Sequence, residues 1–384
     1  MRIMEPASKL QSLKLLDTYF GIHHRRQAFY EALPRLVAFK DKVEQLTVKR
    51  AVAELAFDFS LVFYDVTTLY FESFEPEDLR KPGFSKDNKS QQPQIIMGLM
   101  VTQEGFPIAY ELFAGNKFEG HTLIPVIEAF KARHQIATLT VVADAAMISR
   151  ENVTALRSHG LHYIVGARLG NISLKLLQEV SAALHLQGGA TVRVATAHGN
   201  LVCDFSQKRY YKDARDMERQ IKKAETLVKG SMAVKRAKFL KAGANTRYEL
   251  NVELIEKTRL LLGVKGYYTN LGPEVGNQII IDRYHGLWHV EKAFRIAKSD
   301  LEMRPVFHFK EQAINVHMLI CFMALAVSKY MEIKTRVSLR QIITSFKQVT
   351  DARLLNTTTN QEIIMRTKIP TKVHALLQKL SLSY

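Results

Sequence analysis

Three acidic residues lie where their side chains could hold metal ions. Asp65 falls in the middle of a run of aromatic and β-branched residues, and Asp144 directly follows an apolar run. Glu291 lies in a segment with helical periodicity. Aspartate is disfavoured inside strands, and a buried carboxylate is costly unless it is paired or bound to a metal. Together they could hold two Mg²⁺ ions, with Mn²⁺ as a substitute, for phosphodiester cleavage.

The segment around the two aspartates predicts an α/β domain. Strand patterns, helical periodicity and turn residues give the order strand, strand, strand, helix, strand, helix, strand. The strands are expected at 57–67, 94–102, 107–113, 139–143 and 162–167, with helices at 121–134 and 149–159. The first three strands can pair antiparallel, whereas the last two require crossover connections. We therefore expect an RNase H-like mixed sheet flanked by helices.

This topology could bring the carboxylates together. If the first and fourth strands are neighbours, Asp65 and Asp144 meet at one sheet edge, and a helix packed on the sheet adds Glu291. Each residue also has an ordinary structural interpretation. Asp65 could be a strand-edge residue, and Asp144 could cap a turn. Glu291 could form an i,i+4 ion pair with Arg295.

The charge of the chain predicts a polyanionic partner. Its 384 residues carry 54 basic and 37 acidic side chains, a net charge of +17. Residues 61–170 have 10 basic and 12 acidic side chains, a net charge of −2, whereas 171–384 have 34 and 18, a net +16. Nucleic acid fits this pattern better than a membrane surface, because no helix convincingly combines a basic face with an apolar one. The longest apolar stretch, 318–327, is too short to span a membrane, and we expect it in a buried helix.

The remaining segments complete a four-part domain prediction. Residues 1–57 read as a helical segment, 58–170 with 267–330 as the catalytic domain, and 331–384 as a helical basic segment. Residues 171–266 are expected to form a β-rich basic insertion, with strands at 191–197, 201–205 and 247–255. A basic helix at 208–229 within it offers contacts to DNA phosphates, as does the loop 81–89. The candidate DNA-binding side chains of this helix are Lys208, Arg209, Lys212, Lys222 and Lys223.

The predicted helix at 279–301 carries a specific spacing. Tyr284, Glu291 and Lys298 are separated by seven residues each, close to two helical turns, so we expect all three side chains on one stripe of this helix. This spacing resembles the Y-(2)-R-(3)-E-(6)-K signature of bacterial insertion-sequence DDE transposases of the cut-and-paste type. The arginine of the signature falls at Leu287. Arg295 and Arg283 are nearby candidates to supply its charge.

Further stretches over about residues 58–330 are similar to the same family. The runs Phe63-Tyr64-Asp65-Val66-Thr67-Thr68 and Val142-Ala143-Asp144-Ala145-Ala146-Met147-Ile148-Ser149 resemble its two aspartate motifs. Gly83 to Asp87, Gln94, Gly98-Leu99, Gly105-x-Pro107 and Gly115-Asn116-x-x-Glu119 resemble the segments between them. The run Leu301-x-x-Arg304-Pro305-Val306-Phe307-His308, with His317 downstream, resembles the segment after the catalytic helix.

The resemblance implies a DNA transposase. Its catalytic, metal-binding residues would be Asp65, Asp144 and Glu291. The residues that contact DNA would include Tyr284, Lys298 and Arg295. Its reactions would be Mg²⁺-dependent hydrolysis at transposon ends and transfer of the freed 3′-OH to target DNA. The implied partners are double-stranded DNA and a second copy in a synaptic homodimer, in the cytoplasm beside the nucleoid.

Two other functions remain open from the sequence. The chain could be an inactive or truncated transposase that acts as a DNA-binding regulator, because only about 60 residues precede the strand of Asp65. It could also be a general RNase H-like nuclease. The sequence contains no GxxxxGK[ST] loop, so it does not indicate an ATP-driven motor.

Several single residues complete the expectations. Trp288 is expected in the core, and His121, His308 and His317 in structural roles. Tyr210, Tyr211 and Phe239 are candidates to hold an unstacked base. Cys203 and Cys321 form no disulfide framework.

Overall fold

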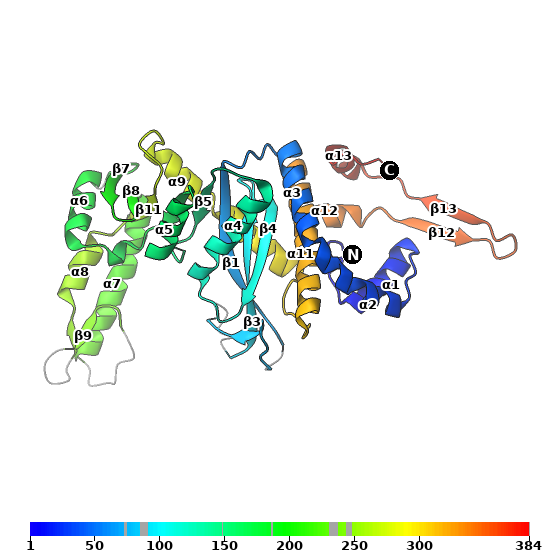
Figure 1. Ribbon diagram of the computed structural model, residues 1–384, viewed down its shortest axis with the longest axis horizontal. Helices are drawn as coiled ribbons and strands as arrows, with labels where there is room; N and C mark the ends of the chain where they lie inside the picture. Colours follow the sequence, from blue (N-terminus) through cyan, green and yellow to red (C-terminus); the bar gives the residue numbers. More distant parts are fainter. Residues whose placement is uncertain are drawn as a thin grey trace. The chain divides into compact units, whose positions relative to one another are not determined.

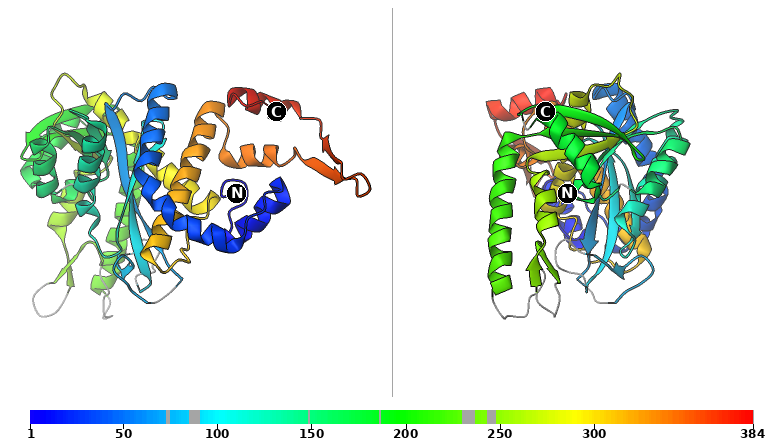
Figure 2. Two further views of the ribbon diagram at one scale, coloured as in Figure 1. Left: turned by 45° about the vertical axis from the view of Figure 1, so that its right-hand side comes forward. Right: turned by 90° about the vertical axis from the view of Figure 1, so that its left-hand side faces the viewer.

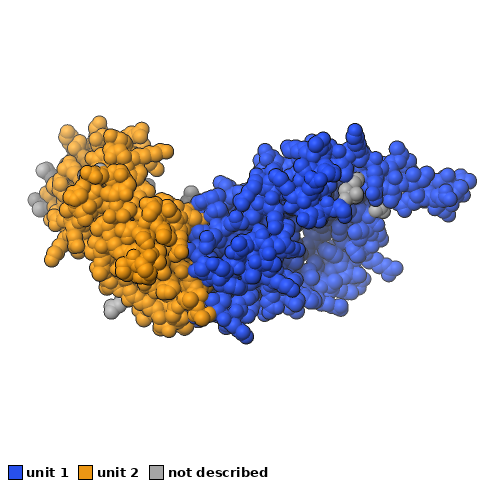
Figure 3. Space-filling view, turned by 90° about the horizontal axis from the view of Figure 1, so that it is seen from above, with its two compact units in different colours: residues 1–136, 288–384 blue, residues 137–287 orange. Residues whose placement is uncertain are grey.

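The chain folds into two compact units, each described by itself. The computed structural model describes residues 1–72, 75–84, 91–147, 149–185, 187–229, 237–242 and 248–383. Unit 1 comprises Met1–Ile136 with Trp288–Tyr384, and unit 2 comprises Ala137–Leu287 (Figure 3). The predicted four-part domain division remains a prediction, and the two units do not follow its boundaries.

An antiparallel sheet forms the centre of unit 1. Strand β3 (Pro93–Val101) pairs with β1 (Leu61–Tyr70), with β4 (Pro107–Ala114) and with the short β2 (Lys81–Pro82). The predicted β3–β4 hairpin is confirmed; its turn contains Gly105 at φ +80°, which favours glycine. Because β1 and β3 are buried on both faces, they read as nearly continuous apolar runs in the sequence.

Helices cover this sheet. The N-terminal helical elements are α1 (Lys9–Phe20), α2 (Arg26–Ala32), a 3₁₀ helix (Leu33–Phe39) and α3 (Lys40–Glu54). A 3₁₀ turn (Glu119–His121), α4 (Leu123–His134) and α11 (Glu311–Thr335) follow along the chain. Helices α3, α4 and α11 all contact β4, and α3 lies beside α11 (Figure 1).

A buried ion cluster connects α3 and α4 to the sheet. Glu44 of α3 is fully buried and accepts a hydrogen bond from the backbone N–H of Tyr110 at 3.1 Å. Arg133 of α4 and Lys40 also pair with this carboxylate. Burial nevertheless raises the pKa of Glu44. Removing either cation would therefore leave a buried charge less compensated.

Helix α11 is the apolar core helix that the sequence predicts. Among the described residues it alone has the length and apolarity to cross a membrane. However, 61% of its apolar window is buried inside the protein, as in the core helix of a globular domain.

The C-terminal part differs from the all-helical prediction for 331–384. Helices α12 (Leu339–Phe346) and α13 (Thr371–Lys379) are present, but a β-hairpin of β12 (Asp351–Leu355) and β13 (Glu362–Arg366) lies between them (Figure 1). Its turn is set locally, because the Asn356 side chain accepts hydrogen bonds from the N–H groups of Thr358 and Thr359.

Unit 2 contains a mixed sheet. Strands β5 (Thr140–Ala143) and β6 (His162–Gly166) are parallel, with the crossover helix α5 (Arg150–Ser158) between them in the chain. The sheet continues antiparallel through β11 (Val264–Thr269), β8 (Gly199–Phe205) and β7 (Thr191–Thr196). The predicted insertion therefore extends the sheet of this unit. Helices α6 (Leu174–Leu184) and α9 (Asn277–His285) pack on it.

The rest of the insertion has a small core of its own. Helix α7 (Gln207–Lys229) runs beside the hairpin of β9 (Leu240–Ala242) and β10 (Tyr248–Leu250) (Figure 2). Helix α8 (Val252–Arg259) follows. The strand expected at 247–255 is thus wrong beyond Leu250, because the Asn251 side chain caps α8 by accepting the N–H of Leu254. The label β-rich fits the β7–β8 hairpin but not α6, α7 and α8.

The predicted α/β fold class is confirmed. The strands of unit 1 pair antiparallel, those of unit 2 pair both parallel and antiparallel, and helices pack on the strands of each unit. The N-terminal helices, the three antiparallel strands and the basic helix of the insertion all lie where the sequence predicts them.

Candidate active site and nucleic-acid interface

Asp65 lies in the middle of β1, opposite Leu99 of β3. Its carboxylate is half-buried and accepts a hydrogen bond from the N–H of Val66 at 2.8 Å. Successive strand residues point to opposite faces, so Asp65 shares a face with Phe63. An aspartate is thus held inside an otherwise apolar strand, as the sequence predicts.

Helix α10 (Trp288–Arg295) packs against β1 and carries Glu291 in its first turn. The His289 and Phe63 rings stack with centroids 6.2 Å apart and an angle of 15°. Asp65 follows Phe63 by two residues, and Glu291 follows His289 by two. This ring contact therefore holds α10 against the strand of Asp65. Residues two apart on a helix do not share a face, so the contact fixes the helix that carries Glu291 but not the direction of that side chain.

The exposed Glu291 forms no hydrogen bond or ion pair in the part of the chain that the structure describes. The i,i+4 pair with Arg295, which the sequence left open, is not formed. The first turn of a helix favours a carboxylate by roughly 0.3–1 kcal/mol. The charge of Glu291 remains available to a ligand.

His289 is a neutral packing residue. Burial, and then the charges of Lys329 and Lys292, lower its pKa to about 4. Its ring also stacks on Trp288 at 3.9 Å. Trp288 is 51% exposed, so the expectation of a core tryptophan is wrong. Periodicity placed it on a helix but could not show which face is covered.

A buried ion cluster fixes α10 against α11. Glu332 is 8% exposed, and its carboxylate pairs with Lys292 of α10 at 3.0 Å and with buried Lys329 at 3.4 Å. It also accepts the backbone N–H of Leu339 at 3.0 Å. Although burial opposes ionisation of Glu332, these hydrogen bonds and cations hold its pKa below the usual range. The helix that carries Glu291 is therefore held by charge-assisted bonds.

Asp144 lies in unit 2, directly after β5. Its half-buried side chain accepts the N–H of Ala146 at 2.8 Å, and its backbone carbonyl accepts the N–H of Met147 at 3.2 Å. The predicted turn-capping role of Asp144 is therefore real. Among the described residues, only one oxygen of this carboxylate accepts a hydrogen bond. Ser149 caps the following α5 by accepting the N–H of Asn152 at 3.1 Å, at the start of the helix that the sequence predicts.

The predicted stripe of Tyr284, Glu291 and Lys298 on one helix is wrong. Helix α9 ends at His285, a turn at Gly286 and Leu287 follows, and α10 begins at Trp288. Glycine is unfavourable in a helix interior, and here it lies at the break. Lys298 lies in a π-helical turn, Ile296–Asp300, whose extra residue changes the seven-residue register.

Tyr284 packs within unit 2 on the sheet. Its ring lies 4.7 Å from that of Tyr267, and the Lys265 ammonium lies 4.8 Å above it. A Cβ atom at Gly166 would be 2.5 Å from the Tyr284 hydroxyl, so the glycine makes room for this tyrosine. Tyr284 is thus positioned by strand contacts, whereas Arg295 is exposed in unit 1.

Three motif glycines have structural reasons. A Cβ at Gly98 would be 2.3 Å from the hydroxyl of buried Tyr64, which donates to Thr122. A Cβ at Gly83 or Gly115 would meet backbone at about 2 Å. Gln94 holds this loop by donating to the Gly115 carbonyl at 3.0 Å. Residues 85–89 of the predicted DNA-contacting loop 81–89 lie outside the described residues.

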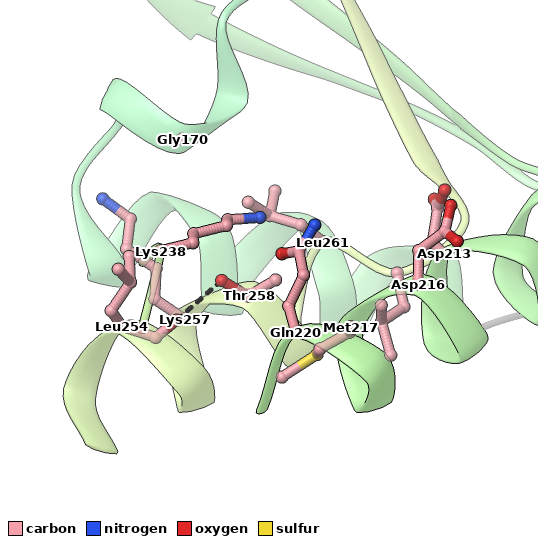
Figure 4. Close-up of a pocket in the computed structure, with 11 residues that line it drawn as sticks. Gly170, Asp213, Asp216, Met217, Gln220, Lys238, Leu254, Lys257, Thr258 and Leu261 are labelled. Atoms are coloured by element: carbon pink, nitrogen blue, oxygen red, sulfur yellow. Dashed lines mark hydrogen bonds between the residues drawn. The ribbon is translucent and has the colours of Figure 1, made fainter. Parts of the chain in front are cut away.

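The basic helix α7 has one inward and one outward face. Asp213, Asp216, Met217 and Gln220 face a cavity of about 300 Å³ that α8 also lines (Figure 4). The outward face carries five exposed cations spaced by three or four residues, and we call this set the basic stripe. Its members are Lys208, Lys212, Arg215, Arg219 and Lys222.

Two of the predicted phosphate contacts lie elsewhere on α7. Arg209 is half-buried and pairs with Asp204 at 3.5 Å, so it serves the interior of unit 2. Lys223 is exposed beside the basic stripe. Arg215 and Arg219 belong to the stripe but were not among the selected contacts. A helical projection of the sequence would have found both.

Among the base-holding candidates, Phe239 is fully buried in the small core of the insertion and cannot stack on a base. Tyr211 is 63% exposed. The histidine expectation holds for His317, which is buried and bonded to the Met303 carbonyl at 3.1 Å.

The carboxylates have the donor chemistry of a site for Mg²⁺ or Mn²⁺, because these hard cations prefer oxygen ligands. Asp65 and Glu291 belong to contacting elements of unit 1, and Asp144 belongs to unit 2. In the described parts of the chain, no three His, Cys, Asp or Glu side chains are grouped closely enough to hold a metal ion.

One family model matches most of the chain. The family profile described as "Transposase DDE domain" matches residues 56–327. The structure is similar to one described as "piggyBac transposase synaptic complex with hairpin DNA", with a TM-score of 0.42 and 8% identity over 83% of this chain and 51% of the other. A "Mos1 transposase paired-end complex" matches with a TM-score of 0.21 and 15% identity over 41% and 50%. The chain thus spans about half the length of these solved proteins, and no curated protein matches it.

Proposed function

The chain belongs to the DDE transposase family, and we propose that it is a metal-dependent DNA transposase acting on the ends of an insertion sequence. Its substrates would be double-stranded transposon ends and target DNA. It would cut a phosphodiester by hydrolysis at each end and then join the freed 3′-OH to the target. Its expected place is the cytoplasm, beside the nucleoid.

The availability of Glu291 carries this proposal. An exposed carboxylate without an ion pair among the described residues lies on α10, which a ring stack holds against the strand of Asp65 and a buried ion cluster holds against α11. A purely structural glutamate would be expected to use a neighbouring cation such as Arg295. Fixed position without a protein partner is what a metal-binding carboxylate requires.

We propose that Asp65, Asp144 and Glu291 together hold two Mg²⁺ ions, with Mn²⁺ as a substitute. The bound metal would supply Lewis-acid stabilisation of the charge that develops on the phosphodiester. The three carboxylates position the metal, and their backbone bonds restrain the two aspartates. Neutral His289, which packs on the strand of Asp65, adds no competing positive charge there.

The basic stripe would bind the DNA backbone. Its five cations cover fourteen residue steps of α7, or about 21 Å of helix. Lys223, Arg295, Lys298 and Tyr284 are further candidate contacts. Arg209 is better assigned to the interior because of its pair with Asp204. Two copies of the chain would pair the two ends in a synaptic homodimer.

The test is cleavage of DNA that carries the inverted repeats flanking the gene, with and without Mg²⁺. We expect wild-type cleavage and its loss in Asp65→Asn and in Glu291→Gln. Glu311→Gln, an exposed substitution at the start of α11, is the matched control and should cleave normally. Undiminished cleavage by Asp65→Asn would overturn the assignment. DNA binding without cleavage by the wild type would favour the regulator, and equal cleavage of DNA without repeats would favour the general nuclease.

A further inference from the structure

A cationic cavity lies in unit 1, and none of the three carboxylates lines it. It is about 730 Å³ in volume and is enclosed by the start of the chain, α1, α2 and the segment after the π-helical turn. Its wall is basic and aromatic. The residues that matter for its chemistry are Arg2, Lys9, Tyr30, Arg304, Phe307 and His308.

The two N-terminal cations of this cavity have no carboxylate partner among the residues described. Arg2 donates to the backbone carbonyls of Ala7 and Glu302, both at 3.0 Å. The Lys9 ammonium bonds to Nε2 of His308 at 2.6 Å. Carbonyl and imidazole acceptors satisfy hydrogen bonds but do not neutralise charge. Two positive charges therefore face one half-buried cavity without a counter-ion from the described part of the chain.

Glu302 also lines the cavity, but its side chain is exposed, and in the described part of the chain its carboxylate pairs with neither Arg2 nor Lys9. Burial, then Lys9 and Arg2, lower the pKa of His308 to about 4, so its ring is a neutral acceptor at pH 7. Cys321 of α11 lies 3.7 Å from the Arg2 guanidinium, but burial raises the pKa of its thiol. The pKa of Lys9 falls to about 8, mainly through burial. An anion bound in the cavity would compensate the positive charges of Lys9 and Arg2 and so stabilise their protonated forms.

The local backbone favours an anion in the same place. Ser8 caps the twelve-residue helix α1 by accepting the N–H of Gln11 at 3.1 Å, and Ser8 lines the cavity beside Lys9. The positive end of the helix dipole thus adds to the charge of Arg2 and Lys9.

The size and the aromatic wall indicate more than a simple ion. A cavity of this volume is in the range that binds small organic ligands. Phe307 is 68% exposed and Tyr30 is 42% exposed, so both rings offer accessible faces. Aromatic faces bind bases with little dependence on base identity.

We propose that this cavity is a nucleotide-binding subsite in which Arg2 and Lys9 bind the phosphate and the rings of Tyr30 and Phe307 contact the base. If the proposed transposase function holds, its natural occupant is a nucleotide of the bound DNA strand. Phosphate binding itself does not depend on that function.

The experiment is calorimetric titration of the full chain with inorganic phosphate, dTMP and thymidine at equal ionic strength and pH 7. The variants are Lys9→Gln and Arg2→Gln, with Lys14→Gln as the matched control, because Lys14 is exposed on the same helix outside the cavity. We expect dTMP to bind wild type and Lys14→Gln more tightly than phosphate does. Binding of both should weaken at least tenfold in Lys9→Gln and Arg2→Gln.

Thermal unfolding without ligand provides the second measurement. Lys9→Gln should unfold at or above the wild-type temperature, because it removes an uncompensated charge. The proposal is overturned if phosphate and dTMP bind Lys9→Gln and wild type equally, or if thymidine binds as tightly as dTMP. If phosphate and dTMP bind equally tightly, the proposed contacts of the Tyr30 and Phe307 rings with the base are refuted. If the wild type binds dTMP but does not cleave end-bearing DNA, only the transposase proposal is contradicted.

Discussion

Replacing three lysines of the basic stripe should change how DNA binding depends on salt. Lys208, Lys212 and Lys222 are exposed and have no ion pair among the described residues, whereas Arg219 pairs with Asp216 at 2.9 Å. The triple change to Gln therefore removes three cations that are available to bind phosphates. Removing one phosphate-binding cation reduces the slope of log K against log salt by about 0.9, so the slope should fall by about 2.7.

The expected effect is large enough to measure. Between 50 and 200 mM salt, the wild type should lose about 40-fold more affinity for duplex DNA than the variant does. The assay is fluorescence anisotropy of a labelled duplex at five salt concentrations. The control is Lys14→Gln/Lys42→Gln/Lys49→Gln, which removes the same net charge from α1 and α3.

The two triple variants separate a local from a general effect of charge. If the stripe binds the backbone, the slope changes in its variant and stays near the wild-type value in the control. Equal slopes for the wild type and the stripe variant would refute the reasoning. Equal reductions in both variants would show that only net charge matters.

Three further predictions concern the framework of the site. Glu332→Gln should lower the free energy of unfolding by about 3–5 kcal/mol in urea titrations, because it leaves two lysines poorly compensated; an unchanged midpoint would contradict the anchoring role. Gly166→Ala should lower the free energy of unfolding by about 1–3 kcal/mol, because the added methyl group displaces Tyr284. In the Tyr284→Ala background, urea titration should show no further loss when Gly166→Ala is added. Stability should fall as pH drops from 6.5 towards 4, because the unfolded chain protonates His317 and His308 while the fold keeps their pKa values at about 3 and 4. His308→Gln should make stability depend less steeply on pH. An unchanged pH profile in this variant would contradict the claim that His308 is neutral in the folded protein.

The strand of Asp65 and the antiparallel hairpin were predictable because local pattern and burial agree there. Strand β1 is apolar on both faces, and the hairpin has a glycine at its positive-φ turn. Asp65 stands out against that pattern, and the cap at Ser149 is equally local. Features of this kind need only a few consecutive residues.

The break between α9 and α10 was missed because hydrophobic periodicity continues through it. Gly286 and Leu287 separate the two helices, and periodicity alone does not weigh the low helix propensity of this glycine. The hairpin of β12 and β13 was missed because its strands are exposed, so no core-facing alternation distinguishes them.

Contacts between distant residues were beyond reach of the sequence. Arg2 and Glu302 are 300 positions apart, and their contact follows no sequence pattern. The exposure of Trp288 depends on which face of α10 is covered by β1 and β3. Only the packed structure defines such relations.

Manganese binding to the DNA complex tests the central claim most directly. Electron paramagnetic resonance can count Mn²⁺ bound to wild type, Asp65→Asn, Asp144→Asn and Glu291→Gln, each assembled on end-bearing DNA without Mg²⁺. We predict that the wild-type complex binds two ions and that each substitution removes at least one of them. Wild-type stoichiometry in all three variants would contradict the claim that these carboxylates form one metal centre.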